Sequence, residues 1–287
     1  MTQAITNDLR EWIVAQAKAG FPAEAVLKSM VDAGWDEDVA TDALESTLKD
    51  HLAGIPITSK KQEEDLPPLL TLPVPQLQDS PLYLDCGDRI VNVLSSVAKP
   101  HIVVFGNVVS DEECDALIAA AKPRMSRSLT VETKTGGEEL NADRTSNGMF
   151  FKRDEFEVVA TLERRLAKLA NWPVENGEGL QILHYRPGTE YKPHYDYFDP
   201  KEPGTPTILK RGGQRVATII VYLNEPEKGG GTTFPDVGVE VAPKRGNAVF
   251  FSYDRAHPVS KSLHGGAPVI AGEKWIATKW LRERVFV

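Results

Sequence analysis

The chain has 287 residues, of which 41% are hydrophobic and 26% charged, and its formal net charge is −8. These values are ordinary for a soluble globular protein, and the length suits one large domain with a small additional module. The acidic balance argues against general binding to nucleic acid or to an anionic membrane, and no stretch approaches the roughly 18 apolar residues of a transmembrane helix.

Residues 1–50 predict a small module of three short helices. Apolar residues at helical spacing stop at Gly20 and again at Gly34, and Asp36 is placed to cap the third helix. With Gly-Phe at the first turn and Gly-Trp at the second, the pattern resembles the ubiquitin-associated family of three-helix modules. That resemblance implies a protein partner. The alternative is a helical module that has no partner or that only packs on the main domain.

Residues 51–80 predict a semi-rigid linker. They contain LPPLLTLPVPQLQDSP after a charged run. Dense prolines favour an extended conformation and remove hydrogen-bond donors. The leucines in this segment could instead lie against the domain that follows.

Residues 81–287 indicate an α+β domain. Ser110 and Glu113 form a capping box for one helix, and a second helix is expected over 155–169. Short apolar runs separated by glycine and proline follow, and they predict strands. Many short strands after a helical start favour a double-stranded β-helix, or jelly roll, with supporting helices. The glycine pair at 265–266 is expected to form a turn.

His194 and Asp196 stand two residues apart in a segment with a strand pattern, so their side chains are expected on one face. Two imidazoles and one carboxylate that leave other coordination positions open form the facial triad of mononuclear non-haem Fe(II) oxygenases. His257 and His264 are both candidates for the third ligand. His257 precedes a proline, which suits a loop, whereas His264 lies ten residues ahead of Lys274. For any single histidine, a structural role is the alternative.

Lys274 lies in the apolar strand-like run EKWIATKWL. Strand alternation places Lys274, Ile276, Thr278 and Trp280 on one face and Lys279 on the other. A buried ammonium needs a specific anionic partner, so an inward lysine at the end of a barrel is suited to the distal carboxylate of a dicarboxylate. The alternative is a surface lysine whose head reaches solvent.

Six segments between residues 100 and 285 follow one another in a specific order. They are SDEECDALIAAAKPRMSRS, RTSNGMFF, GLQILHYRPGTEYKPHYDYF, RVATIIVYLNEPEKGGGTTFP, PKRGNAVFF and HGGAPVIAGEKWIATKW. This set resembles the prolyl 4-hydroxylase family of 2-oxoglutarate- and Fe(II)-dependent dioxygenases. The resemblance implies Fe(II), with 2-oxoglutarate and O₂ as cosubstrates and ascorbate as a further candidate. It also implies hydroxylation of prolyl residues in a peptide or protein, coupled to decarboxylation of 2-oxoglutarate to succinate and CO₂.

The resemblance further implies a ligand set. It assigns iron to His194, Asp196 and His264, which excludes His257. Lys274 is implied as the partner of the distal carboxylate of 2-oxoglutarate. Related halogenases keep a small residue at the position of Asp196, so halogenation is disfavoured.

Other positions match cosubstrate and substrate contacts of the family. Tyr185 and Thr232 match positions that help hold the cosubstrate, and Tyr191, Arg215 and Trp280 match positions that line a peptide groove. Arg144 matches a position near that groove, with a structural ion pair as the alternative. The polar segment 199–214 is expected to be a mobile flap over the site.

Three other functions are weighed against peptidyl-proline hydroxylation. One is hydroxylation of free proline or another small metabolite. A second, oxygenation of nucleic-acid bases, is disfavoured by Lys274 and by the net acidity. A third, a non-enzymatic ubiquitin-binding adaptor, is disfavoured by the intact ligand set.

The cysteines and the N-terminus predict a cellular location. Cys86 and Cys114 form no CxxC pair and no disulfide framework, which favours a reducing compartment. The first residues do not place a basic segment before an apolar core, as a secretory leader would. We therefore expect a cytoplasmic protein.

Overall fold

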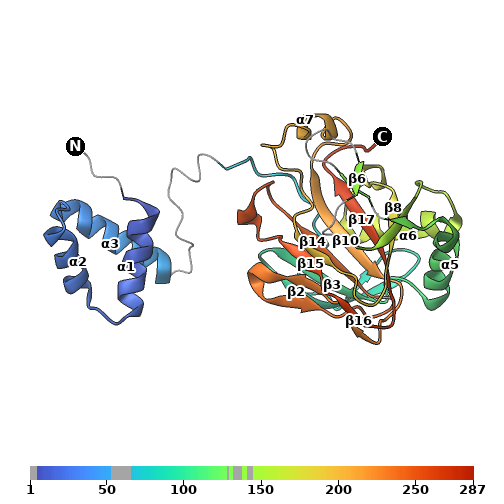
Figure 1. Ribbon diagram of the computed structural model, residues 1–287, viewed down its shortest axis with the longest axis horizontal. Coiled ribbons are helices and arrows are strands. Elements are labelled where there is room, and N and C mark those ends of the chain that lie inside the picture. The colour runs from blue at the N-terminus through green and yellow to red at the C-terminus, as the bar shows by residue number, and fades with distance from the viewer. Residues whose placement is uncertain (1–4, 53–65, 128, 132–137, 141–144) are drawn as a thin grey trace. The chain divides into compact units, whose positions relative to one another are not determined.

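The computed structural model of the protein is shown in Figure 1. It describes residues 5–52, 66–127, 129–131, 138–140 and 145–287. The chain divides into two compact units, Met1–Leu66 and Pro67–Val287. Among the described residues, no helix combines the length and apolar character needed to cross a membrane.

The first unit contains the three predicted helices, α1 (Asn7–Lys18), α2 (Ala23–Asp32) and α3 (Glu37–Leu52). The Oδ1 atom of Asp36 accepts hydrogen bonds from two backbone N–H groups at the start of α3, which confirms the predicted cap. The helices close around a small apolar core made of Ile13, Val26, Met30, Ala40, Ala43 and Leu44.

The proline-rich segment begins the second unit. Pro73 and Pro75 are buried, and the N–H of Leu70 donates to the carbonyl of Asp254 at 2.8 Å. Leu70, Leu72 and Leu77 pack against the main core. The later part of the predicted linker therefore lies against the large domain, while residues 53–65 are outside the described part of the chain.

The second unit is a double-stranded β-helix. Its nine-stranded sheet has the spatial order β1 (Tyr83–Asp85), β2 (Ile90–Val97), β3 (His101–Gly106), β14 (Ala248–Ser252), β10 (Arg215–Tyr222), β17 (Lys274–Arg282), β8 (Leu180–Tyr185), β7 (Asn147–Phe151) and β4 (Ser126–Arg127). The four-stranded sheet has the order β13 (Val239–Val241), β12 (Thr232–Phe234), β15 (His264–Gly266) and β9 (Tyr191–His194). Two short pairs join β11 (Lys228–Gly229) to β16 (Val269–Ala271), and β5 (Leu129–Val131) to β6 (Glu138–Leu140).

The two faces of the large sheet pack against different partners. Because side chains alternate along a strand, Ile219 and Val221 of β10 enter the core shared with the helices α5 (Asp111–Ala121) and α6 (Glu157–Ala170). Ile220 and Tyr222 point the other way, into a core shared with the four-stranded sheet. All eight residues of β10 are buried for this reason. The site described below lies on the second face.

The helix predictions for this unit are close to the structure. Ser110 and Glu113 form the predicted capping box at the start of α5. The helix α6 begins two residues later than expected, at Glu157. The segment 199–214 contains the short helix α7 (Thr205–Ile208), and its role as a flap stays a prediction. Short 3₁₀ turns occupy Lys122–Arg124, Val174–Asn176, Pro235–Val237 and Pro258–Ser260.

The prediction of a turn at 265–266 was wrong, because both glycines lie in strand β15. A Cβ on Gly265 would lie 3.0 Å from the carbonyl oxygen of Tyr191 and 3.1 Å from the nitrogen of Pro193. Glycine is needed here because β9 approaches closely.

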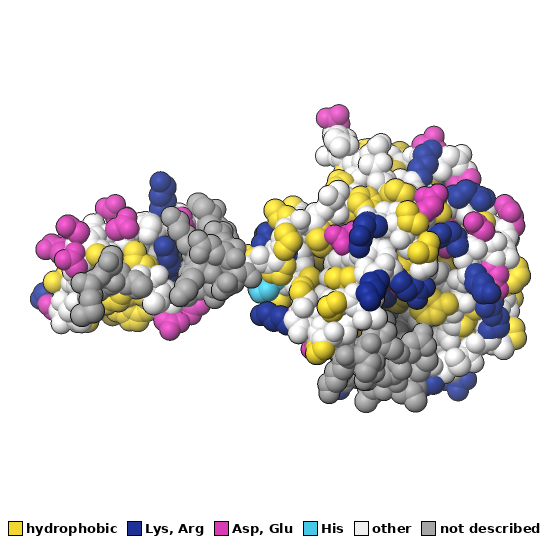
Figure 2. All heavy atoms as spheres, turned by 90° about the horizontal axis from the view of Figure 1, so that it is seen from above, with side chains coloured by type: hydrophobic (Ala, Val, Ile, Leu, Met, Phe, Trp, Pro, Cys, Tyr) yellow, Lys and Arg dark blue, Asp and Glu magenta, His cyan; other side chains and the backbone are white. Residues whose placement is uncertain are grey.

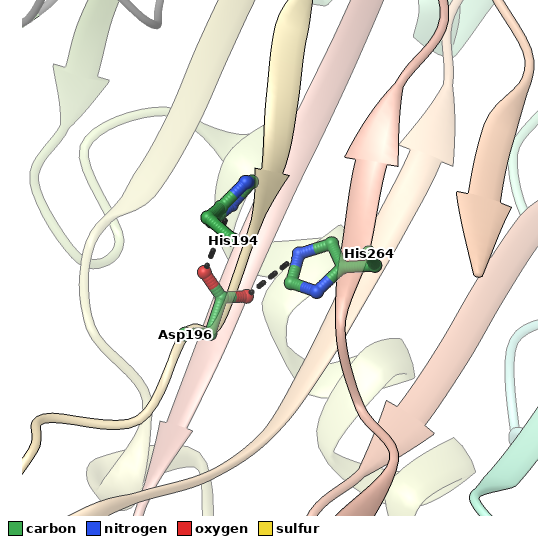
Figure 3. Close-up of side chains that lie close together, drawn as sticks. All are labelled: His194, Asp196 and His264. Atoms are coloured by element: carbon green, nitrogen blue, oxygen red, sulfur yellow. Dashed lines mark ion pairs between the residues drawn. The ribbon is translucent and has the colours of Figure 1, made fainter. Parts of the chain in front are cut away.

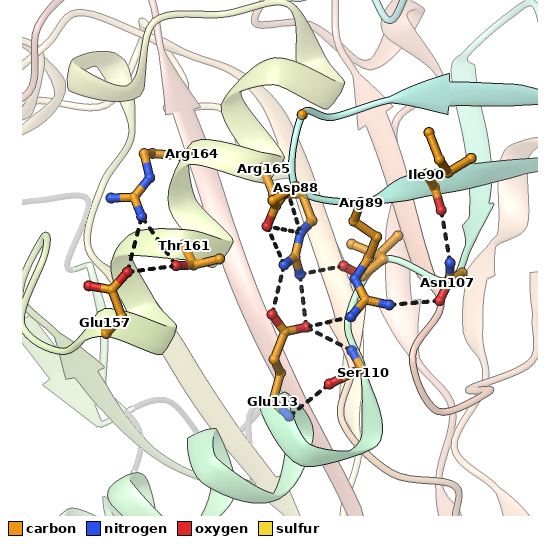
Figure 4. A network of polar contacts seen from close by, with 12 residues as sticks. Asp88, Arg89, Ile90, Asn107, Ser110, Glu113, Glu157, Thr161, Arg164 and Arg165 are labelled. Carbon is orange, nitrogen blue, oxygen red and sulfur yellow. Dashed lines mark hydrogen bonds and ion pairs between the residues drawn. The ribbon is translucent and has the colours of Figure 1, made fainter.

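Arg165 of α6 joins the helical layer to the edge of the large sheet (Figure 4). Its guanidinium is 2.5 Å from a carboxylate oxygen of Asp88 and 2.7 Å from one of Glu113, and it also donates to the carbonyl of Val108. The Arg165 side chain is only 2% exposed. The next residue, Arg164, pairs with Glu157 at the surface, where both side chains are largely exposed.

These two neighbouring arginines make a matched pair for a stability measurement. We expect Arg165→Met to lower the free energy of unfolding by about 2–3 kcal/mol, because it removes the shared partner of two carboxylates; the partial exposure of Asp88 moderates the loss. Arg164→Met should change it by less than about 0.5 kcal/mol. Urea unfolding followed by circular dichroism measures the free energy of unfolding of both variants. Equal losses would contradict a larger contribution of the buried Arg165 to stability.

Candidate active site

His194, Asp196 and His264 converge between the two sheets (Figure 3). His194 ends β9 and His264 begins β15, and the two residues are directly paired in the sheet. Asp196 lies two residues beyond the end of β9. His194 Nε2 is 3.5 Å from Asp196 Oδ1, and His264 Nε2 is 3.4 Å from Asp196 Oδ2. One donor atom from each residue lies within 4.8 Å of the others.

Backbone carbonyls orient both imidazole rings. His194 Nδ1 lies 2.8 Å from the carbonyl of Lys192, and His264 Nδ1 lies 3.0 Å from the carbonyl of Ser262. A carbonyl can only accept, so in each neutral ring the proton sits on Nδ1 and the lone pair on Nε2. Both rings therefore present Nε2 as a ligand atom.

Burial and neighbouring groups set the protonation of His264 and Asp196. Burial lowers the pKa of His264 to about 4, so this ring is neutral at pH 7. Burial alone would raise the pKa of Asp196, but the neighbouring His264, His194 and Arg215 hold that pKa well below its usual range. Neutral imidazole and ionised carboxylate are the forms that bind a metal.

This donor set fits Fe(II) in a facial triad, which leaves positions for exogenous ligands. In the described part of the chain, it is the one His/Cys/Asp/Glu cluster with metal-binding geometry. His257 is not part of it. Its Nδ1 accepts a hydrogen bond from the N–H of Val259 at 3.1 Å and thus caps a 3₁₀ turn.

Lys274 points into the same cavity from β17 and is 2% exposed. Its Nζ lies 5.4 Å from the ring centre of Tyr185 and 5.9 Å from that of Tyr222. Burial lowers the pKa of Lys274 to about 8, although Glu240 acts in the opposite direction. Among the described residues it has no ion-pair partner, so the cavity holds a buried cation suited to an anionic ligand.

Strand alternation along β17 was predicted correctly. Lys274, Ile276, Thr278 and Trp280 all line the cavity. Lys279 points to the opposite face, but α6 covers it there, and it forms a buried ion pair with Glu163 at 2.5 Å.

The other residues singled out from the sequence lie at or next to the cavity. Tyr185, Tyr191, Thr232 and Trp280 line it. The Tyr191 ring stacks on His194 with ring centres 3.7 Å apart. Thr232 Oγ1 accepts a hydrogen bond from the Tyr222 hydroxyl at 2.7 Å.

Arg215 lies beside the cavity wall. Its guanidinium is 4.0 Å from the ring centre of Trp280, and its Nε donates to Glu178 at 2.7 Å. Its Nη1 lies 3.5 Å from the backbone carbonyl of Asp196, so Arg215 links Trp280 in the cavity wall to the backbone of Asp196. Arg144 lies outside the described residues.

Several lining residues had been given no role. They are Leu183, Thr218, Ile220, Gly265, Gly266, Ile276 and Thr278. Alternation along β10 contained the signal for Thr218, because it shares a face with Ile220 and Tyr222. Glu178, the partner of Arg215, had no signal in the sequence, since it comes from a distant segment.

Comparison with known proteins identifies the family. Residues 180–282 match the model of the 2OG-Fe(II) oxygenase superfamily. The chain is 42% identical over 221 residues to prolyl 4-hydroxylase 5 of Arabidopsis thaliana, a match that covers 70% of this chain and 74% of the relative. The chain belongs to the prolyl 4-hydroxylase family.

Other prolyl hydroxylases are also similar to this chain in sequence or structure. The identity to prolyl 4-hydroxylase 1 of Arabidopsis thaliana is 40% over 215 residues, covering 68% of this chain and 74% of that protein. A solved structure, the viral collagen prolyl hydroxylase of Paramecium Bursaria Chlorella virus-1 in complex with 2OG, is similar with a TM-score of 0.50 and 31% identity. That match covers 63% of this chain and 95% of the viral one. The protein is thus a dioxygenase that uses Fe(II), 2-oxoglutarate and O₂, as the sequence predicted.

Proposed function

We propose that this dioxygenase hydroxylates prolyl residues of a peptide or protein at the cavity around His194, Asp196 and His264. Trp280 carries the proposal. Its ring lines the cavity, and its buried Nε1–H finds no hydrogen-bond partner among the described residues. A buried donor without a partner is unfavourable, so this N–H in the cavity wall is suited to an acceptor that a bound chain would supply. Names of the relatives, prolyl 4-hydroxylases, point to the same substrate class.

The ligand roles follow from the side-chain chemistry. His194, Asp196 and His264 would hold Fe(II), which supplies O₂ activation when it is bound. Lys274 would hold the distal carboxylate of 2-oxoglutarate through a charge-assisted hydrogen bond. Because the Tyr222 hydroxyl donates to Thr232 Oγ1, the Thr232 proton is free to be donated into the cavity. The ring of Tyr185 lies beside Lys274 and would shield the bound carboxylate from water.

The lowered pKa of Lys274 predicts a pH-dependent affinity for 2-oxoglutarate. The cation that holds the carboxylate is populated below about pH 8 and is lost above it. The Kd for 2-oxoglutarate should therefore rise as pH increases through about 8, approaching about tenfold per pH unit. Anaerobic equilibrium dialysis with Fe(II) measures it. A Kd that is flat or decreases over this range would rule out a protonated Lys274 as the binding form.

The substrate class is tested with Fe(II), 2-oxoglutarate and either a proline-containing peptide or free proline. We expect one added oxygen atom on a proline of the peptide by mass spectrometry and none on free proline. Oxygen on free proline or another metabolite, with none on any proline peptide, would support small-metabolite hydroxylation instead.

Ascorbate use and a cytoplasmic location belong to the same proposal. Support for a reducing compartment comes from Cys86 and Cys114, which are buried and free, with the pKa of each thiol raised to about 11 by burial.

Support for ascorbate comes from the need to keep the iron as Fe(II). Repeated turnover should fall when ascorbate is left out of the succinate assay, and equal turnover would remove this part of the proposal.

For the helical module, we propose a protein partner of the ubiquitin type. Phe21 and Trp12 are 55% and 37% exposed. Figure 2 shows both acidic and basic side chains beside apolar ones on the face of the module that it draws. Exposed aromatic residues are enriched at protein interfaces. Titration of the full chain with ubiquitin should shift the NMR signals of these two side chains, and unchanged signals would exclude this partner.

A further inference from the structure

Thr218 lies behind the triad in the middle of β10, in the run VATIIVY, where its neighbours are apolar. Its side chain is fully buried. The Oγ1 atom donates a hydrogen bond of 2.6 Å to Asp196 Oδ2. It also lies 3.2 Å from the hydroxyl of Tyr253, which is fully buried as well. Two hydroxyl groups therefore stand in series behind one of the triad residues.

The direction of this chain is fixed by the chemistry of its members. An ionised carboxylate only accepts, so the single hydroxyl proton of Thr218 is donated to Asp196. The Tyr253 hydroxyl must then donate to Thr218 Oγ1. Burial and the nearby charge of Asp196 raise the pKa of Tyr253 well above its ordinary value, so this proton is retained.

We propose that Thr218 and Tyr253 are positioning residues of the metal centre. Because Asp196 Oδ2 accepts the hydrogen bond from Thr218, the carboxylate is kept from binding a metal in a bidentate manner, through both oxygens. The metal then receives three protein ligand atoms, and the remaining positions stay available for the cosubstrates. The inference rests on the assignment of His194, Asp196 and His264 as ligands, and it does not depend on the identity of the substrate.

Packing alone does not explain Thr218. A valine has nearly the same shape and would match the apolar neighbours in β10, whereas a buried hydroxyl is unfavourable unless it is hydrogen-bonded.

A buried hydroxyl on the neighbouring strand β14 offers a comparison. Ser252 of β14 is buried, pairs with Ala217 next to Thr218, and its Oγ has no hydrogen-bond partner among the described residues.

The test measures Co(II) binding to the full chain, by calorimetry and by the electronic absorption spectrum, which reports the number of ligand atoms. Thr218→Val should weaken Co(II) binding by about 10–100-fold and change the spectrum. Tyr253→Phe should weaken it by about fivefold, as expected for one neutral hydrogen bond. Thr218→Ser keeps the hydroxyl and should retain the wild-type spectrum, with affinity within about threefold.

Ser252→Ala is the matched control and should bind Co(II) like the wild type. Wild-type affinity and spectrum in folded Thr218→Val would overturn the proposal, as would an equal loss in Ser252→Ala. If Thr218→Val does not fold, Tyr253→Phe decides the question, and wild-type binding by that variant overturns the proposal. His264→Ala tests the ligand assignment separately from the positioning role of Thr218 and Tyr253. If this variant binds Co(II) like the wild type, the ligand assignment itself is wrong.

Discussion

Replacement of His264 by alanine is expected to weaken Fe(II) binding by more than about 100-fold and to stop 2-oxoglutarate turnover. Loss of a group that only orients a ligand typically weakens metal binding by about 10–100-fold, so loss of a ligand should exceed that. His264 faces His194 across two paired strands, and no other imidazole among the described residues reaches the cluster. Metal content measured after anaerobic loading, together with succinate formation, gives both quantities.

His257→Ala is the control for this change. His257 stands seven residues earlier and caps a 3₁₀ turn through its Nδ1 atom. The variant should keep metal binding and turnover, with at most a small loss of stability from the missing cap. Loss of iron in His257→Ala with retention in His264→Ala would reverse the ligand assignment.

Replacement of Lys274 by methionine should raise the KM for 2-oxoglutarate by about 10²–10³-fold. Removing one partner of a buried ion pair typically costs about 3–5 kcal/mol, and each 1.4 kcal/mol is about tenfold. Fe(II) binding should change little, because Lys274 is not among the clustered ligand atoms. The KM is obtained from succinate formation at saturating Fe(II).

Two comparisons make the lysine test specific. Lys228→Met removes an exposed lysine of β11 and should leave the KM unchanged. A 2-oxo acid of the same length without the distal carboxylate should be a poor cosubstrate for the wild type. For Lys274→Met, the KM for this 2-oxo acid should equal the KM for 2-oxoglutarate. If the variant retains the preference, the carboxylate is held elsewhere.

Local sequence pattern predicted those parts of the site that lie within one strand. Alternation over residues 273–281 placed Lys274, Thr278 and Trp280 on one face, because a period of two needs no knowledge of the rest of the fold. The capping box at Ser110 was equally local. The family resemblance then selected His264, which the pattern alone had left open against His257.

The remaining features depend on contacts between distant segments. Asp196 lies beyond its strand, and its position is maintained by Thr218 and Arg215, which come from β10. Whether Gly265 forms a turn or a strand depends on how closely β9 approaches it. Alternation placed Lys279 on the opposite face of the strand, and its burial there follows only from the position of α6. Such features require the register between strands, which no single segment contains.

Turnover under heavy-isotope O₂ tests prolyl hydroxylation at the site of His194, Asp196 and His264. A proline-containing peptide is incubated with Fe(II), 2-oxoglutarate and labelled O₂, and both products are analysed by mass spectrometry. We predict one labelled oxygen in a hydroxyproline of the peptide and one in succinate for each turnover, with neither product formed by His264→Ala. Succinate formed without any labelled peptide would exclude hydroxylation of the peptide, and labelled peptide formed by His264→Ala would exclude His264 as an essential ligand.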